Sequence, residues 1–315
     1  MHKIWKPLIA VLAIGLAAFL LYRTLSRYSL DQLIAAVSSI PVAHLAAAGG
    51  FAAASYVCLS GFDYLALRYV GRPQPYYRAA WASFTSLSLG HNIGLAFLSS
   101  GAVRYRFYTR WGVSAEQVAK IIVFCGITVG LGLMILGGAA LLLRTELAVE
   151  ITGLSKPVVI AAGIGCLALP GLYLVLSAVV KKPIRIRRWA LHIPPLHIAL
   201  AQIAIGSVNF ACVAACLHQA LAAVTDVAYA GVASVYVIAN TTALISHVPG
   251  GLGVIESVVM YLLPGQDLIG PLLVFRFVYF LVPLCVGIVV FLATELIYRR
   301  KIHRPTEIAE TPARA

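Results

Sequence analysis

The apolar residues of this chain occur in long unbroken runs rather than in the spaced stripes of a soluble amphipathic helix. A helix needs roughly 20 mostly apolar residues to cross the hydrocarbon layer of a bilayer. Six runs reach or approach that length: residues 7–22, 42–67, 118–143, 158–180, 196–223 and 271–297. The first run follows a basic start, as in a signal peptide, but its apolar residues continue up to Arg23. We therefore expect an uncleaved first helix.

Two further apolar segments, residues 79–103 and 229–263, are interrupted by Ser, Thr, Asn, His and Gly. Non-helical backbone at membrane depth must be buried in protein or line a wet cavity, so such breaks predict a polar interior. The pattern predicts an all-α polytopic membrane protein with six full transmembrane helices and two broken or re-entrant helical hairpins. Residues 23–41 are expected to form an amphipathic helix on the outer surface of the membrane.

Composition and charge agree with this class. Hydrophobic residues make up 61% of the chain and charged residues 11%, with a mean hydropathy of +0.92 and a net charge of +13. If both hairpins return to their own side and the N-terminus is cytoplasmic, most of the 24 Lys and Arg residues face the cytoplasm. This bias, together with anionic inner-leaflet lipid, accounts for the positive charge, and no nucleic-acid partner is predicted. We expect a multi-pass protein of the bacterial plasma (inner) membrane with both termini cytoplasmic.

The same topology makes the second half of the chain an inverted copy of the first. We predict a single integral membrane domain over residues 1–304 with inverted halves 1–150 and 151–304, followed by a disordered cytoplasmic tail, 305–315. Inverted repeats with broken helices are the architecture of many secondary transporters. Asn92 and Asn240 occupy similar places in the two interrupted segments, each in a Ser/Thr-rich stretch before small residues.

The break in the second interrupted segment carries the candidate chemistry. Gly250, Gly251 and Gly253 allow tight turning after a proline, and a new helix is expected to start at about Leu252. The free N–H groups of that helix start suit a phosphate or carboxylate. Arg104 ends a related stretch and could hold phosphate through two nitrogens. The alternatives are close helix packing for the glycines and interfacial anchoring for Arg104.

Charged residues inside the membrane are costly, and they often mark a functional pathway. Glu256 follows the glycine break and Arg276 lies near the start of the last run, so we predict that they pair, either as a functional site or as a structural salt bridge. Asp63 is expected at the interface. His91 and His247 lie in the two breaks, where a hydrogen-bonded histidine is more common than a catalytic one.

The six cysteines all lie inside apolar runs, so we interpret them as packing residues without disulfides. No metal-binding spacing or P-loop occurs, and no cofactor, metal or ATP hydrolysis is predicted.

Two stretches carry a resemblance to a known family. They are SSGAVRYR at residues 99–106, followed by WG at 111–112, and PGGLGVIE at residues 249–256. Together they resemble the membrane domain of bacterial lysylphosphatidylglycerol synthase/flippases, a family that includes the multiple peptide resistance factor. The resemblance covers nearly the whole chain and implies a lipid flippase fold. Longer members add a soluble aminoacyl-transferase domain after this region. The chain ends where that addition would begin, so aminoacyl transfer is not inferred.

The resemblance and the polar breaks together predict a flippase-like protein that moves a phospholipid or related lipid between leaflets. The expected partners are membrane lipids, anionic or aminoacylated, and a homo-oligomer is compatible with the sequence. The candidate substrate-binding residues are Asn92, Arg104, Asn240, Gly250, Gly251, Gly253, Glu256 and Arg276. Three alternatives stay open: a small-solute secondary transporter, an intramembrane enzyme with a metal between His91, His247 and Glu256, and a non-transporting scaffold of envelope biogenesis.

Overall fold

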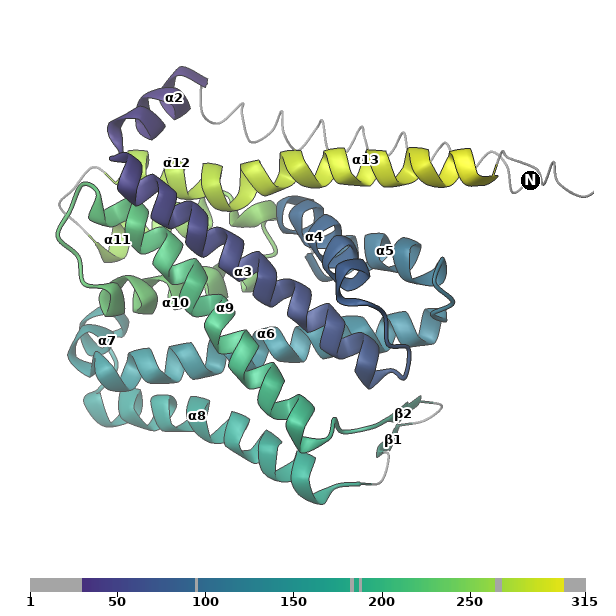
Figure 1. Cartoon of the computed structure of the whole chain (residues 1–315). Helices are drawn as coiled ribbons and strands as arrows, with labels where there is room; N and C mark the ends of the chain where they lie inside the picture. Colours follow the sequence, from purple (N-terminus) through teal and green to yellow (C-terminus); the bar gives the residue numbers. More distant parts are fainter. Residues whose placement is uncertain (1–29, 94–95, 182–183, 187–188, 264–267, 303–315) are drawn as a thin grey trace, which may run out of the picture.

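The structure, a computed structural model, is a bundle of helices with one short β-ribbon (Figure 1). It describes residues 30–93, 96–181, 184–186, 189–263 and 268–302. The helices of the first half are α2 (Leu30–Ser39), α3 (Val42–Tyr69), α4 (Tyr76–Ile93), α5 (Ala96–Thr109), α6 (Ala115–Leu143) and α7 (Thr145–Thr152). Those of the second half are α8 (Lys156–Val179), α9 (Leu196–Ala222), α10 (Tyr229–Ser246), η1 (Pro249–Gly251), α11 (Val254–Leu262), α12 (Ile269–Arg276), the π-helix η2 (Phe277–Leu281) and α13 (Val282–Ile302). Strands β1 (Ile184–Ile186) and β2 (Trp189–Leu191) pair antiparallel before α9.

Six helical segments of the described chain are long and apolar enough to cross a membrane. Five of them, α3, α6, α8, α9 and the continuous segment α12–η2–α13, match predicted spans. The sixth is α10, which we had placed as the first arm of an interrupted segment. The predicted first span, residues 7–22, and the tail 305–315 lie outside the described residues. α2 forms a helix within the expected amphipathic segment, its place on the membrane surface stays a prediction, and residues 23–29 lie outside the described residues.

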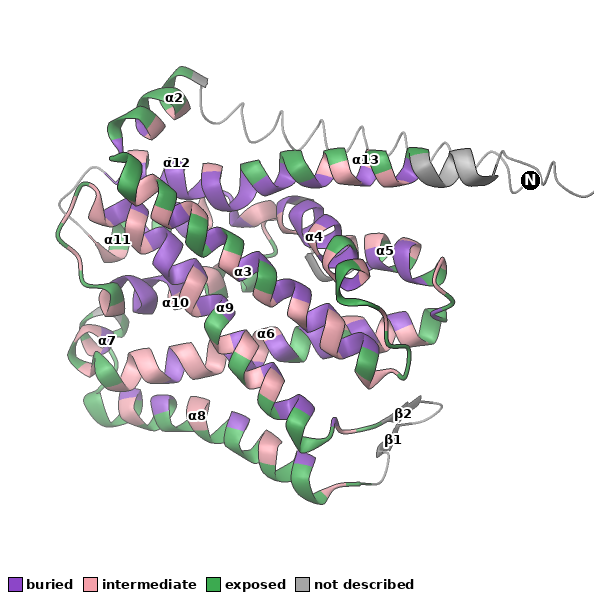
Figure 2. Ribbon diagram, viewed as in Figure 1, coloured by how far each residue is buried: buried purple, intermediate pink, exposed green. Residues whose placement is uncertain are grey.

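The surface is apolar where a soluble protein would be polar. α8 exposes Leu169, Leu172 and Val175 on its outer side, and its residues are mostly exposed in Figure 2. Polar side chains lie inside instead, and α4 buries a serine-rich set that includes Ser83 and Ser88. The arrangement is the inverse of that of a water-soluble bundle, and it confirms the predicted membrane class.

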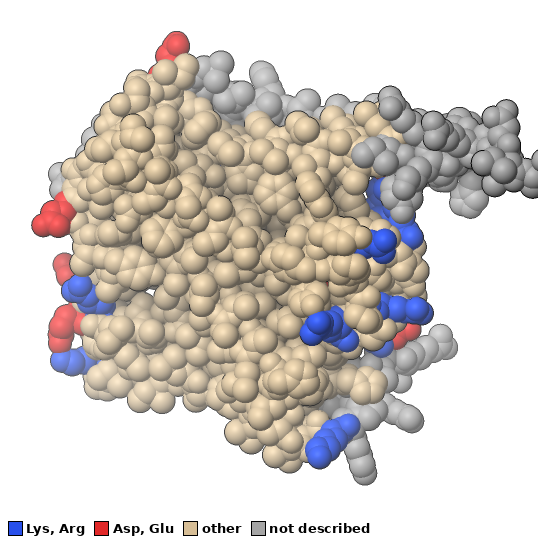
Figure 3. Space-filling view, in the orientation of Figure 1, with Lys and Arg blue, Asp and Glu red and all other residues tan. Residues whose placement is uncertain are grey.

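Charged side chains gather at two opposite ends of the bundle. Figure 3 shows Lys and Arg mainly at the end formed by α4 and α5, acidic residues mainly at the other end, and a broad uncharged band between them. Arg68 lies in the last turn of α3 and Lys181 follows α8, whereas Glu146 and Glu150 lie on α7. We call these the basic end and the acidic end. The separation agrees with the predicted charge bias, although which end faces the cytoplasm stays a prediction.

Each interrupted segment contains two helices, α4 and α5 in the first and α10 and α11 in the second. The α4–α5 pair starts and finishes at the basic end, where Gln117 at the start of α6 donates a hydrogen bond to the carbonyl of Val70 after α3 (3.2 Å). The α10–α11 pair lies toward the acidic end (Figure 1). α10 has 18 residues and α3 has 28, or about 27 and 42 Å of helix, so α10 ends short of the basic end. Their re-entry into a bilayer stays a prediction.

The packing is compatible with the predicted inverted halves. α3 and α9, which would be equivalent helices, pack along each other at the centre (Figure 1). α4 packs against α13, and its expected counterpart α10 packs against α6. These pairings are the ones that an inverted repeat requires, and the repeat itself stays a prediction.

The crossing of α6 and α9 depends on two glycines. A Cβ atom on Gly132 would lie 2.5 Å from the backbone of Gly206, so Gly132→Ala should force the helices apart. We expect a loss of about 1–3 kcal/mol in the free energy of unfolding, measured by thermal unfolding in detergent. The matched control is Gly130→Ala on the same helix, because a Cβ there meets nothing within 4 Å. Equal stability of the two variants would contradict this crossing.

Candidate functional site

The break between α10 and α11 is built by glycines with left-handed backbone. Gly250, Gly251 and Gly253 have φ of +62°, +57° and +83°, a region that residues with a Cβ rarely adopt. Gly253 precedes α11 directly, and its N–H donates to Oε2 of Glu256 (2.9 Å). The carboxylate of Glu256 therefore occupies the anion site that the sequence predicted at the start of this helix.

Glu256 pairs with Arg276, as predicted. Nε of Arg276 donates to Oε1 of Glu256, and Nη2 donates to Oε2 (2.9 Å). Nη1 donates to the carbonyl of Gly250, and Nη2 also donates to that of Gly251 (2.8 Å). Arg276 and Glu256 are 3% and 7% exposed. The one guanidinium therefore neutralises a buried carboxylate and also donates hydrogen bonds to the two backbone carbonyls of the glycine break. All three guanidinium nitrogens are engaged.

The end of α4, in the first interrupted segment, lies next to the Glu256–Arg276 pair. A Cβ atom on Gly250 would lie 3.5 Å from the backbone oxygen of His91 and 3.7 Å from Nη1 of Arg276. The next residue, Asn92, donates from Nδ2 to the carbonyls of Ser88 (2.9 Å) and Phe280 (3.5 Å). Phe280 belongs to η2, which follows Arg276 directly, and a π-helix of this kind frequently marks a functional site. The ends of α4 and α10 thus converge on one buried polar centre, which we call the junction.

Arg104 and Asp63 form a second buried ion pair, and our expectation that Asp63 is interfacial was wrong. Asp63 is fully buried because Arg104 holds both its carboxylate oxygens, Nε to Oδ1 and Nη2 to Oδ2, each at 2.8 Å. Tyr108 donates a further bond to Oδ1, and Nη1 of Arg104 donates to Ser100 (2.9 Å). This pair ties α5 to α3. Phosphate binding by Arg104 stays a prediction, and its guanidinium is occupied in this arrangement.

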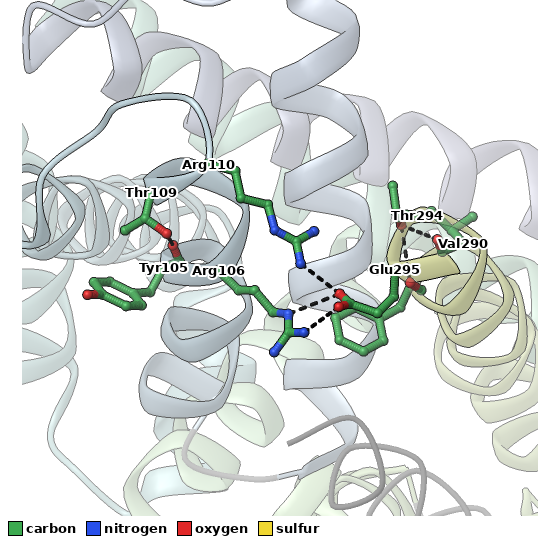
Figure 4. A network of polar contacts seen from close by, with 8 residues as sticks. Tyr105, Arg106, Thr109, Arg110, Val290, Thr294 and Glu295 are labelled. Atoms are coloured by element: carbon green, nitrogen blue, oxygen red, sulfur yellow. Dashed lines mark hydrogen bonds and ion pairs between the residues drawn. The ribbon is translucent and has the colours of Figure 1, made fainter. Parts of the chain in front are cut away.

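A third charged group lies at the basic end. Arg106 on α5 and Arg110 directly after it both donate to the carboxylate of Glu295 on α13 (Figure 4), with Nη2 of Arg110 2.7 Å from Oε2. Their side chains are about a fifth exposed, as expected of arginines that anchor a helix end at a membrane interface.

The remaining candidates lie apart from the ion pair. Asn240 on α10 accepts a hydrogen bond from Tyr236 of the preceding turn (3.4 Å). His247 is exposed, and its Nδ1 lies 2.7 Å from the carbonyl of Ile245. Within the described residues, no group of three or more His, Cys, Asp or Glu side chains is placed to hold a metal ion.

Sequence reasoning missed a buried network beside the junction. Ser55 on α3 donates to Oδ1 of Asn209 on α9 (2.7 Å), and its hydroxyl lies 3.0 Å from that of Tyr279 in η2. Asn209 is a polar amide inside a predicted transmembrane span. Because polar side chains are costly there, this residue could have indicated the buried network from sequence.

Comparison with known proteins identifies the family. The model of the lysylphosphatidylglycerol synthase transmembrane region matches residues 9–287. The chain belongs to this family. Its relatives include the uncharacterized protein slr0712 of Synechocystis sp. (strain ATCC 27184 / PCC 6803 / Kazusa), 31% identical over 98% of both chains. The inner membrane protein YbhN of Escherichia coli (strain K12) is 29% identical over 80% of each chain. The junction of this lysylphosphatidylglycerol synthase transmembrane-region protein lies within the matched residues.

Proposed function

We propose that this member of the lysylphosphatidylglycerol synthase transmembrane-region family moves an anionic or aminoacylated phospholipid between leaflets. The observation that carries the proposal is the junction, where two broken helices converge on the buried Glu256–Arg276 pair. Headgroup charge is expensive to carry through hydrocarbon, and a polar interior reached by broken helices lowers that cost.

The chemistry of the pair suits exchange of one anion for another. The carboxylate of Glu256 accepts hydrogen bonds from the backbone N–H of Gly253 and from the guanidinium of Arg276. A lipid phosphate is also an oxyanion that a guanidinium and a helix start can bind. In the proposed cycle, the phosphate displaces Glu256 from Arg276, and Glu256 later returns and releases it.

Polar side chains near the break offer an approach for a headgroup. Thr241, Thr242 and Ser246 are exposed on the last turns of α10, directly before the glycine break. We propose that the headgroup reaches the junction along these hydroxyls while its acyl tails stay in lipid. We also propose that the basic end is cytoplasmic, which gives the orientation that the positive-inside rule favours.

The test is leaflet exchange in proteoliposomes. Purified protein is reconstituted with a fluorescent phosphatidylglycerol, and the outer-leaflet label is reduced chemically by an impermeant reagent. We expect loss of fluorescence beyond the outer-leaflet half at a rate several-fold above protein-free vesicles. The same rate as in protein-free vesicles, with insertion verified by protease accessibility, would contradict the proposal and favour the small-solute or scaffold alternatives.

A further inference from the structure

His91 occupies a position at the junction that the proposed exchange of anions does not use. Its ring stacks on Tyr279 with centroids 6.3 Å apart and planes 18° apart, and the rings of Tyr56 and Phe280 lie at 6.3 and 6.5 Å. Its Nδ1 is buried and has no hydrogen-bond partner among the described residues. A buried imidazole nitrogen of this kind is unusual, because buried polar atoms are nearly always satisfied.

The charged groups around His91 are already paired. The ionisable side chains that face this region are Tyr56 and Asp63 on α3, Arg104 on α5, Glu256 on α11, Arg276 on α12 and Tyr279 in η2. The two carboxylates are held by the two arginines. Among the residues that the structure describes, a proton on His91 would therefore add a third cation without a free anion to balance it.

We infer that His91 is a proton-binding site whose protonation separates the two helix breaks. The backbone oxygen of His91 and Nη1 of the Arg276 side chain lie next to Gly250, so the two breaks meet at the residue that would be charged. Proton uptake favours an arrangement in which water or a carboxylate can reach the ring, and in our proposal the contact with Gly250 opens to give this access. The inference rests on the proposed function for its use in transport, where it makes the proton the coupling ion.

The inference gives a quantitative expectation. If opening of the junction takes up one proton, the opening equilibrium shifts about tenfold per pH unit over the range in which the imidazole titrates. Opening exposes backbone N–H groups to exchange with solvent, so hydrogen exchange measures it without any assay of lipid movement.

The experiment is hydrogen-exchange mass spectrometry of the full chain in detergent between pH 5.5 and 7.5. Rates for peptides covering residues 84–93 and 249–256 are corrected for the intrinsic pH dependence of exchange. We expect the wild type to exchange up to about tenfold faster per unit of decreasing pH. His91→Phe, which keeps an aromatic ring for stacking, and His91→Gln should show no such slope. His197→Gln, an exposed histidine at the start of α9, should keep the wild-type slope.

The outcomes separate the two claims. A wild-type protein without a pH-dependent slope at these peptides would overturn the inference, whether or not the variants fold. A slope that persists in a folded His91→Phe protein would overturn it as well. If the slope depends on His91 but the protein moves no lipid, the proton site stands and the proposed function fails.

Discussion

Glu256→Gln should abolish lipid exchange in proteoliposomes. The glutamine can still accept a hydrogen bond from Arg276, but it leaves a buried cation without a counter-charge. Removing one partner of a buried ion pair costs about 3–5 kcal/mol. In the proposed cycle, Glu256 displaces the bound phosphate from Arg276. A cost of that size at this step would slow lipid exchange roughly a hundredfold or more. The leaflet assay measures the rate, with Glu146→Gln as the control, because the pair of Glu146 with Lys156 is exposed.

A double variant separates a functional pair from a structural one. Glu256→Gln combined with Arg276→Gln removes both charges, and this should recover much of the stability lost in the single variant. We expect the double variant to fold and to remain inactive, since neither an oxyanion nor a guanidinium is left. Lipid exchange at the wild-type rate in either variant would remove the pair from the mechanism.

Asp63→Asn should cause a large loss of stability. Asp63 neutralises Arg104 through two bonds and accepts a third from Tyr108, all in the interior of the bundle. The variant leaves the Arg104 cation buried, so we expect a loss of about 3–5 kcal/mol in the free energy of unfolding. Thermal unfolding in detergent and the yield of monodisperse protein measure it.

The control for this prediction is Glu116→Gln. Glu116 forms an i,i+4 pair with Lys120 at the start of α6, and its side chain is 61% exposed. Exposed helical pairs contribute only about 0.3–0.5 kcal/mol, so this variant should unfold almost as the wild type does. If Asp63→Asn is as stable as Glu116→Gln, Asp63 is hydrated and the buried pair with Arg104 is wrong.

The sequence predicted those features that depend on local pattern. Apolar runs defined α3, α6, α8 and α9 to within a few residues, because a span must be about as long as the bilayer is thick. The glycine break and its pairing of Glu256 with Arg276 were also predictable, since both depend on residues that a membrane interior tolerates only for a reason.

Features that depend on which helices meet were not predictable. Asp63 lies two turns before the end of α3, where the local sequence looks the same whether the residue is interfacial or buried. Only the packing of α5 against α3 brings Arg104 to Asp63. The π-helix after Arg276 has no sequence signature, and its carbonyls are used by Asn92 and Tyr56 from distant helices. The aromatic rings around His91 come from α3 and η2, far apart in the chain.

The proposed junction requires two helix breaks that enter the membrane from opposite sides, and cysteine accessibility tests this most directly. Single cysteines replace Arg72, Glu116, Asp226 or Ile269 in a protein without native cysteines and are labelled by an impermeant maleimide in intact cells and in inverted vesicles. We predict that positions 72 and 116, which flank α4–α5, react from one side, and that positions 226 and 269, which flank α10–α11, react from the other. Labelling of 72 and 116 from different sides would show that α4–α5 crosses the membrane, which would contradict the junction as the meeting point of two returning hairpins.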